Sequence, residues 1–172
     1  FLAETYSAEK LSAELANSES VTFIAYKNGT PLGYLKLNIG NAQTEKCLDN
    51  ALEIQRIYIL KSAKGQGIGS AFMQIAENFA SEKKLSTIWL GVWEHNEPAK
   101  KFYKSKGYEK FSHHTFVIGD DMQTDFLLKK KFYDLGQNKR TAFKDCPKNV
   151  IWFKSKLCDD FAVNRTAKTC GI

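Results

Sequence analysis

The sequence predicts one α/β domain, a sheet with helices packed against it, and three observations support this prediction. Segments with the alternation and β-branched content of strands are interspersed with segments of helical period. A glycine cluster joins a strand-like segment to a helix-like one at residues 65–69. The chain has 172 residues, close to the usual length of one domain, and 43% hydrophobic residues are enough for a core.

The first part of the chain is predicted to form a helix followed by three strands. In chain order the segments are a helix over residues 7–17, strands over 21–26 and 32–39, a loop over 40–50 and a strand over 52–60. Ala8, Leu11 and Leu15 recur at helical spacing. Asn28 and Gly29 suit the positive φ angles of a hairpin turn. The last strand is a nearly continuous apolar run, as expected for a central strand buried on both faces.

The second part alternates helices and strands. The segments are a helix from the glycine cluster to residue 84, a strand over 86–93, a helix over 98–105, and strands over 108–118 and 124–130. An apolar stripe runs from Phe72 to Ala80, Pro98 suits a helix start, and Gly107 suits a helix end. The predicted order is therefore α-β-β-β-α-β-α-β-β.

The charge is distributed unevenly along the chain, and the spacing of the cysteines and histidines does not indicate a zinc site. The net charge of +6 is uneven, because residues 1–131 carry 17 Lys and Arg against 15 Asp and Glu (+2), whereas residues 132–172 carry 8 against 4 (+4). Neither the cysteines nor the histidines have zinc-ligand spacing (Cys47, Cys146, Cys158, Cys170; His95, His113, His114). We expect free thiols and no metal; a disulfide framework is the alternative for an even count.

No part of the sequence predicts a membrane segment or a secretory signal. No run approaches the roughly 18 apolar residues of a spanning helix, and residues 1–20 mix Glu and Lys with apolar positions. We therefore expect a cytoplasmic protein with no membrane partner.

The glycine cluster predicts a phosphate-binding turn. A strand that runs through a glycine-rich turn into a helix presents backbone N–H groups and a positive dipole end to a ligand. The spacing at residues 65–69 is GxGxG, which is neither a P-loop nor a dinucleotide-binding pattern. A purely structural turn is the alternative.

Two motifs in the expected order resemble the GNAT family of N-acetyltransferases. Residues 64–69, KGQGIG, are similar to the family's Gln/Arg-x-x-Gly-x-Gly/Ala loop, although Lys64 stands where Gln or Arg is usual. Residues 96–108, NEPAKKFYKSKGY, are similar to its Asn-x-x-Ala-x-x-Phe-Tyr-x-x-x-Gly-Phe/Tyr segment. The resemblance implies a GNAT fold of the α+β type, with a central, mixed, twisted sheet flanked by helices.

A narrower resemblance is to the bacillar spermidine/spermine N-acetyltransferases. It rests on residues 52–59 (LEIQRIYI), 89–94 (WLGVWE) and 114–125, and similarity covers about residues 1–131. Against that pattern the family's N-terminal strand and most of its first helix are missing. The resemblance implies transfer of an acetyl group from acetyl-CoA to a primary amine of a small polyamine, with no metal.

The resemblance also assigns roles to residues. Acetyl-CoA would be held by the strand after the polar loop, the glycine loop and the second motif (Ile57, Tyr58, Ile59, Lys64, Gly65, Gln66, Gly67, Ile68, Gly69, Ser70, Asn96, Phe102, Tyr103). Tyr103 would be the general acid, the alternative being a core tyrosine. Glu53 is the first candidate to accept the amine's proton and to bind the substrate; Glu94 and His114 are its rivals, and a surface ion pair is the alternative for this carboxylate.

Residues 132–172 are predicted to form a basic extension that is disordered or not native to the domain. They contain three of the four cysteines and a single apolar stretch at 150–153. A nucleic-acid-binding tail is the alternative, but repeated Lys/Arg clusters are missing, so no nucleic-acid partner is expected.

Two alternative functions remain open for the domain. One is a GNAT acting on an aminoglycoside, peptide or lysine, and the other is a non-catalytic acyl-CoA-binding module. Family members often form a homodimer.

Overall fold

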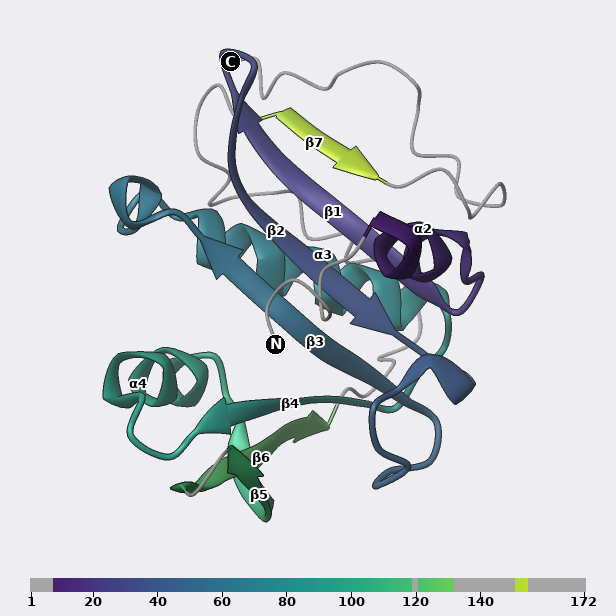
Figure 1. Ribbon diagram of the computed structural model, residues 1–172, viewed down its shortest axis with the longest axis vertical. Coiled ribbons are helices and arrows are strands. Elements are labelled where there is room, and N and C mark those ends of the chain that lie inside the picture. Colours follow the sequence, from purple (N-terminus) through teal and green to yellow (C-terminus); the bar gives the residue numbers. More distant parts are fainter. Residues whose placement is uncertain (1–7, 119–120, 132–150, 155–172) are drawn as a thin grey trace.

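A computed structural model of the chain describes residues 8–118, 121–131 and 151–154, and within them the strands form one seven-stranded sheet in the order β5-β6-β4-β3-β2-β1-β7 (Figure 1). The strands are β1 (Ser20–Lys27), β2 (Thr30–Asn38), β3 (Ala51–Ile59), β4 (Thr87–Trp93), β5 (Glu109–Ile118), β6 (Asp121–Lys131) and β7 (Ile151–Lys154). The helices are α2 (Ala8–Ala16), α3 (Ile68–Glu82) and α4 (Glu97–Ser105), with short 3-10 turns η1 (Gly40–Ala42) and η2 (Lys61–Ala63). Only β3 and β4 pair in parallel, so the sheet is mixed, as expected.

The predicted order of elements from α2 to β6 is confirmed. Asn28 and Gly29 have φ angles of 51° and 77°, the left-handed values that the β1–β2 hairpin turn requires. Helix α3 buries the apolar stripe identified in the sequence, including Phe72, Ala76 and Phe79. Local patterns were sufficient for the hairpin turn and for α3, because the turn needs two residues with positive φ and the helix buries a single stripe.

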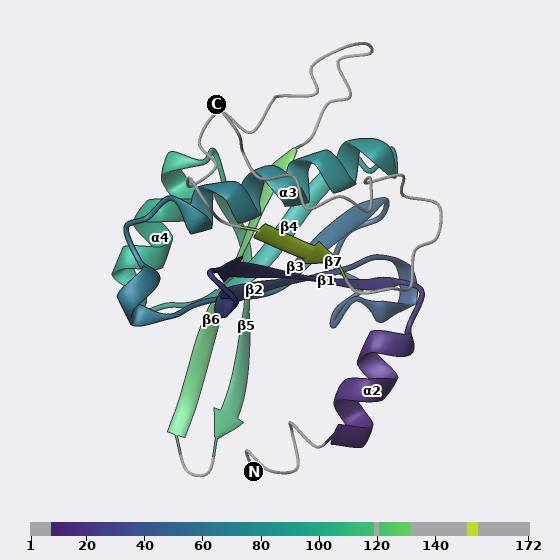
Figure 2. The same ribbon diagram turned by 90° about the horizontal axis from the view of Figure 1, so that it is seen from above.

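The two faces of the sheet carry different layers. Helix α3 covers one face, while α2 and the β5–β6 hairpin project from the other (Figure 2). The main core lies under α3 and includes Leu35, Leu52 and Leu90, each no more than 1% exposed. A second, smaller cluster on the α2 side joins β3, β4 and β6 through buried Ala51, Trp89 and Leu127.

The parallel strands β3 and β4 separate part-way along their length. They pair only where residues 51–53 face residues 87–89, although β3 continues to Ile59 and β4 to Trp93. Figure 1 shows the two strands diverging towards α4. Backbone N–H and C=O groups on the facing edges beyond Glu53 and Trp89 are therefore not joined to each other, and an extended ligand can pair with such groups.

The extension after residue 131 contributes an edge strand. Four residues of β7 pair antiparallel with β1, from Tyr26 opposite Ile151 to Phe23 opposite Lys154. The sequence predicts no strand there, and residues 132–150 and 155–172 lie outside the described part of the chain.

The expectations on disulfides, metal ligands and membrane spans can be compared with the described residues only. Cys47 forms no disulfide there, and the other three cysteines lie outside it. In the same residues, no cluster of three His, Cys, Asp or Glu side chains is arranged to hold a metal. No described helix has the length and hydrophobicity to cross a bilayer.

Candidate active site

A cavity of about 320 Å³ lies where β3 and β4 separate. Its walls come from β2, β3, β4 and α4 (Tyr34, Ile54, Gln55, Arg56, Ile57, Tyr58, Gly91, Val92, Trp93, Asn96, Ala99, Tyr103). This volume is in the range of small-molecule sites. Four of the residues expected from the sequence line it, namely Ile57, Tyr58, Asn96 and Tyr103.

Three aromatic side chains line the cavity on its strand side. Tyr34 and Tyr58 stack with ring centroids 6.1 Å apart, and Trp93 meets His95 edge to face at 5.1 Å. Tyr58 is 60% exposed and Trp93 46%, so both rings are accessible to a ligand. Exposed aromatic faces of this kind attract apolar groups and cations.

Tyr103 reaches the cavity from α4. Its ring packs against Phe102 and Tyr108, with centroids 5.4 and 6.0 Å away, and it contacts the core under α3. Burial raises the pKa of its phenol. The hydroxyl therefore stays protonated at neutral pH and can donate a proton. Asn96 begins the same helix, where its Oδ1 accepts a hydrogen bond from the Ala99 N–H at 3.2 Å.

The glycine loop presents the N-terminus of α3. Gly67 is the N-cap in the left-handed conformation, φ 82°, and no side chain caps the helix. The first N–H groups of α3 therefore have no partner within the helix. A Cβ on Gly69 would lie 3.3 Å from Phe102 and 3.5 Å from Ile59, so the missing side chain lets the helix approach these two residues closely. This cradle suits a pyrophosphate group.

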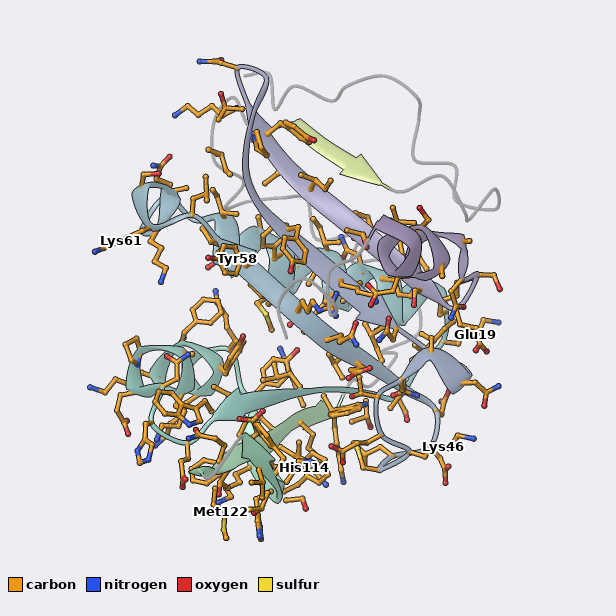
Figure 3. All side chains as sticks on the ribbon, in the orientation of Figure 1. Glu19, Lys46, Tyr58, Lys61, His114 and Met122 are labelled. Carbon is orange, nitrogen blue, oxygen red and sulfur yellow. The ribbon has the colours of Figure 1, made fainter. Side chains whose placement is uncertain are left out.

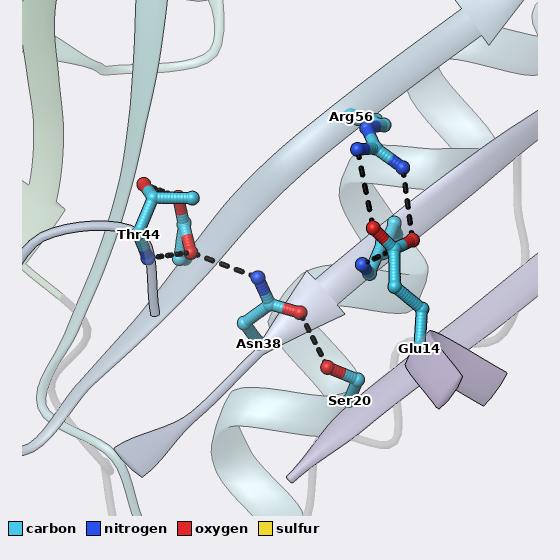
Figure 4. Close-up of polar contacts among 7 residues, drawn as sticks. Glu14, Ser20, Asn38, Thr44 and Arg56 are labelled. Carbon is cyan, nitrogen blue, oxygen red and sulfur yellow. Dashed lines mark hydrogen bonds and ion pairs between the residues drawn. The ribbon is translucent and has the colours of Figure 1, made fainter. Parts of the chain in front are cut away.

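Helix α2 contributes a carboxylate that pairs with Arg56 behind the cavity wall. Glu14 lies 3.0 Å from the Arg56 guanidinium and 2.6 Å from the ammonium of Lys36, which is 5% exposed (Figure 4). Burial alone would raise the pKa of Glu14, but the hydrogen bonds and charges of Lys36 and Arg56 together hold it below its usual value. Glu14 thereby offsets part of the positive charge on this side of the cavity.

The structure brings Glu53 into a buried network and not to the cavity wall. Its carboxylate accepts hydrogen bonds from Asn38 Nδ2 at 3.0 Å, from the Thr44 N–H at 2.9 Å and from the Thr44 hydroxyl (Figure 4). Asn38 Oδ1 in turn accepts from the Ser20 hydroxyl at 2.8 Å. Glu53 is only 3% exposed. These contacts join β1, β2, β3 and the loop before β3, which is what a structural carboxylate does.

Glu94 and His114 also stand away from the cavity wall. The Glu94 carboxylate lies 3.9 Å from His95, and its backbone carbonyl accepts a hydrogen bond from Lys100. His114 is on β5, where its Nδ1 lies 2.9 Å from a Glu45 carboxylate oxygen. Figure 3 shows Tyr58 near the end of β3 and His114 on the hairpin beyond β4.

Comparison with known proteins decides the family. Residues 2–108 match the Acetyltransferase (GNAT) family. An uncharacterized N-acetyltransferase from the pepI 3′ region of Lactobacillus delbrueckii subsp. lactis is 48% identical over 130 residues, which cover 76% of this chain and 75% of that protein. The chain belongs to the GNAT acetyltransferase family.

Solved structures agree with the GNAT fold. The PaiA N-acetyltransferase from Thermoplasma acidophilum, crystallised in complex with coenzyme A, superposes with a TM-score of 0.60 at 25% identity, covering 76% of this chain and 75% of that one. A probable acetyltransferase from Staphylococcus epidermidis superposes at 0.65 with 18% identity, over 76% and 80% of the two chains, which shows the shared fold. This GNAT protein is therefore an acetyl-CoA-dependent N-acetyltransferase.

Several residues that line the cavity were not predicted from the sequence. They include Gln55, Arg56, Gly91 and Trp93. Gln55 and Arg56 are polar residues inside the apolar run of β3, and this interruption was a signal that the strand bulges towards a site. The sequence contains no comparable signal for Gly91 and Trp93, because their position in the cavity wall depends on the point at which β4 separates from β3.

Proposed function

We propose that this GNAT enzyme acetylates a primary amine of a small polyamine such as spermidine or spermine. The observation that carries the proposal is the shared cavity, which Tyr103 lines together with the aromatic side chains of Tyr34, Tyr58 and Trp93. A flexible alkyl ammonium can lay its methylenes on these rings and its charge over their faces. The resemblance of the sequence to polyamine acetyltransferases supports the same substrate class.

The charges around the cavity are compatible with a cationic substrate. Among the described residues, Arg56 is the one charged side chain that lines it, and its guanidinium is paired with Glu14. Because Glu14 also binds Lys36, it lowers the positive potential that would repel a polyamine. The alternative favoured by Arg56 is an amine that also carries a carboxylate, such as a peptide.

Acetyl-CoA would lie across the β3–β4 separation and end at α3. Lys64, Gly65, Gln66, Gly67, Ile68, Gly69 and Ser70 make up the proposed pyrophosphate site. Backbone groups of Ile57, Tyr58 and Ile59 would pair with the pantetheine arm, with Asn96 and Phe102 beside it. The Thermoplasma relative was crystallised in complex with coenzyme A, which supports a coenzyme A site on this fold.

Tyr103 is the proposed general acid. Acetyl-CoA supplies a thioester, whose carbonyl carbon is attacked by the neutral amine as the carbon–sulfur bond breaks. The departing thiolate, whose conjugate thiol has a pKa of about 8.5, takes the phenolic proton. The raised pKa of Tyr103 keeps that proton in place until the thiolate forms.

A steady-state assay with free-thiol detection tests the proposal. Acetyl-CoA is offered with spermidine, spermine, an aminoglycoside and a lysine peptide. Wild-type enzyme should turn over the polyamines, and Tyr103→Phe should lower kcat by roughly 10²-fold with little change in coenzyme A affinity.

Tyr26→Phe on β1 is the matched control and should keep wild-type turnover. Full activity in Tyr103→Phe would remove Tyr103 from the acid role. A preference for the peptide over the polyamines would instead support the substrate class favoured by Arg56.

A further inference from the structure

The side-chain oxygen of Gln55 is a buried hydrogen-bond acceptor without a partner in the described part of the chain. Gln55 is the extra residue of a β-bulge. Lys36 and Leu37 are consecutive in β2, but they pair with Arg56 and Ile54, so Gln55 has no partner residue in β2. Its side chain lines the cavity, and its Oε1 is buried with no hydrogen-bond partner there. An unpaired buried acceptor is costly, and such groups are concentrated where a ligand completes them.

Asp125 stands beside Gly91, which lines the same cavity. It lies on β6 opposite Trp93, on the sheet face that also carries Trp89 and Leu127. Its Oδ2 is 3.7 Å from the point that a Cβ on Gly91 would occupy, and Gly91 lines the cavity. Because glycine has no side chain, nothing at position 91 separates the carboxylate from the cavity.

Burial and the neighbouring charged groups together determine the pKa of the Asp125 carboxyl. His114 stands opposite it on β5, and Glu45, from the loop before β3, pairs with His114. Burial raises the pKa of Asp125, Glu45 raises it further, and His114 opposes both. A carboxylate with a raised pKa is a better proton acceptor than an exposed one.

The proposed acid and this carboxylate approach the cavity from opposite faces of the sheet. Tyr103 comes from α4 and packs against the core under α3, whereas Asp125 lies on the α2 face. A thioester in the β3–β4 separation would therefore have its leaving group on one side and the incoming amine on the other. This arrangement keeps a proton acceptor beside the incoming amine and a proton donor beside the leaving sulfur, so the two proton transfers use different groups.

We propose that Gln55 and Asp125 form the acceptor-amine subsite, in which Gln55 Oε1 accepts a hydrogen bond from the amine and Asp125 binds the ammonium and takes one proton from it. The inference rests on the proposed function and deepens it. The N–H bond breaks, its electron pair stays on nitrogen and forms the bond to the acetyl carbon, and the proton goes to the Asp125 carboxylate. The thiolate released at the other side takes the Tyr103 proton. The acylated nitrogen then loses its second proton to solvent, from which the Tyr103 phenolate is protonated again.

The first test is the pH dependence of kcat/KM for spermidine. In the wild type, kcat/KM should rise with pH as Asp125 ionises. Asp125→Asn should lack this acidic limb, lose roughly 10²-fold at neutral pH and recover as the amine itself deprotonates near a pKa of about 10. The KM for acetyl-CoA should stay unchanged, and Asp49→Asn, an exposed loop carboxylate, is the matched control.

The second test separates binding from folding. Gln55→Leu removes the unpaired acceptor, so it should raise Tm while raising the KM for spermidine roughly ten-fold. A purely structural glutamine would not move these two quantities in opposite directions. Gln74→Leu on α3 is the control and should leave KM unchanged.

The outcomes distinguish this inference from the proposed function. An active wild type whose acidic limb survives in Asp125→Asn, and whose KM for the amine survives in Gln55→Leu, would overturn the subsite alone. A wild type that binds coenzyme A but acetylates none of the amines would refute the proposed function and the subsite with it.

Discussion

At the scale of single residues, Glu53 shows how burial changes the role that a sequence suggests. A carboxylate on the strand beside the acetyl donor was a reasonable proton acceptor. In the structure it accepts three hydrogen bonds from Asn38 and Thr44 and is 3% exposed. A carboxylate with these partners contributes to stability, and its role as proton acceptor stays a prediction.

Glu53→Gln tests this reassignment. The amide would turn one acceptor into a donor that faces the donors of Asn38 and Thr44, so the free energy of unfolding should fall by about 2 kcal/mol. Denaturant unfolding measures this loss, and the acidic limb of the kcat/KM profile should keep its position. A profile displaced to higher pH with unchanged stability would restore Glu53 as the base. Glu109→Gln, an exposed carboxylate on β5, is the control.

At the scale of elements, α2 is attached to the sheet by one carboxylate shared between two cations. Glu14→Gln would leave the buried Lys36 without its carboxylate and weaken the bond to Arg56. Removing one partner of a fully buried pair costs about 3–5 kcal/mol, and partial exposure of Glu14 reduces this to about 2 kcal/mol. Glu19→Gln, in the turn after α2, is the comparison variant.

The same pair predicts a pH dependence of stability. The pKa of Glu14 is lower in the folded protein than its ordinary value of 4.5, so its contribution is present above that value and is lost as the pH falls through the folded pKa. Wild type and Glu14→Gln should therefore differ in unfolding free energy at neutral pH and converge in acid. A difference that persists at low pH would show that packing, and not charge, holds α2.

Elements were predictable from the sequence where one local pattern decides them. The hairpin turn at Asn28 and Gly29 and the apolar stripe of α3 are of this kind. The bulge at Gln55 and the place of Asp125 beside Gly91 depend on the register between strands far apart in the chain. For the same reason, the sequence could identify Tyr103 from its motif but not the residues that face it across the cavity.

At the scale of the whole molecule, the sheet has an edge strand that the sequence analysis did not expect. Strand β7 pairs with β1 through four residues, and β1 and β2 lie between it and the β3–β4 cavity. Removing residues 132–172 would expose the backbone groups of β1 that β7 now covers, while the cavity walls would keep all their residues. An uncovered edge strand loses hydrogen bonds and invites pairing with another chain.

A chain ending at Lys131 should therefore keep the KM for acetyl-CoA and kcat within about two-fold of the full chain. Its Tm should fall by several degrees, and it should associate more readily at high concentration, as measured by differential scanning calorimetry and by light scattering. A chain ending at Lys154 keeps β7 and is the matched control, with the Tm of the full chain. If the shorter chain is folded by circular dichroism but inactive, residues 132–154 act on the cavity itself and the extension belongs to the enzyme's working unit. If both truncations share the full chain's Tm, the pairing of β7 with β1 adds nothing to stability and the edge of the domain is β1.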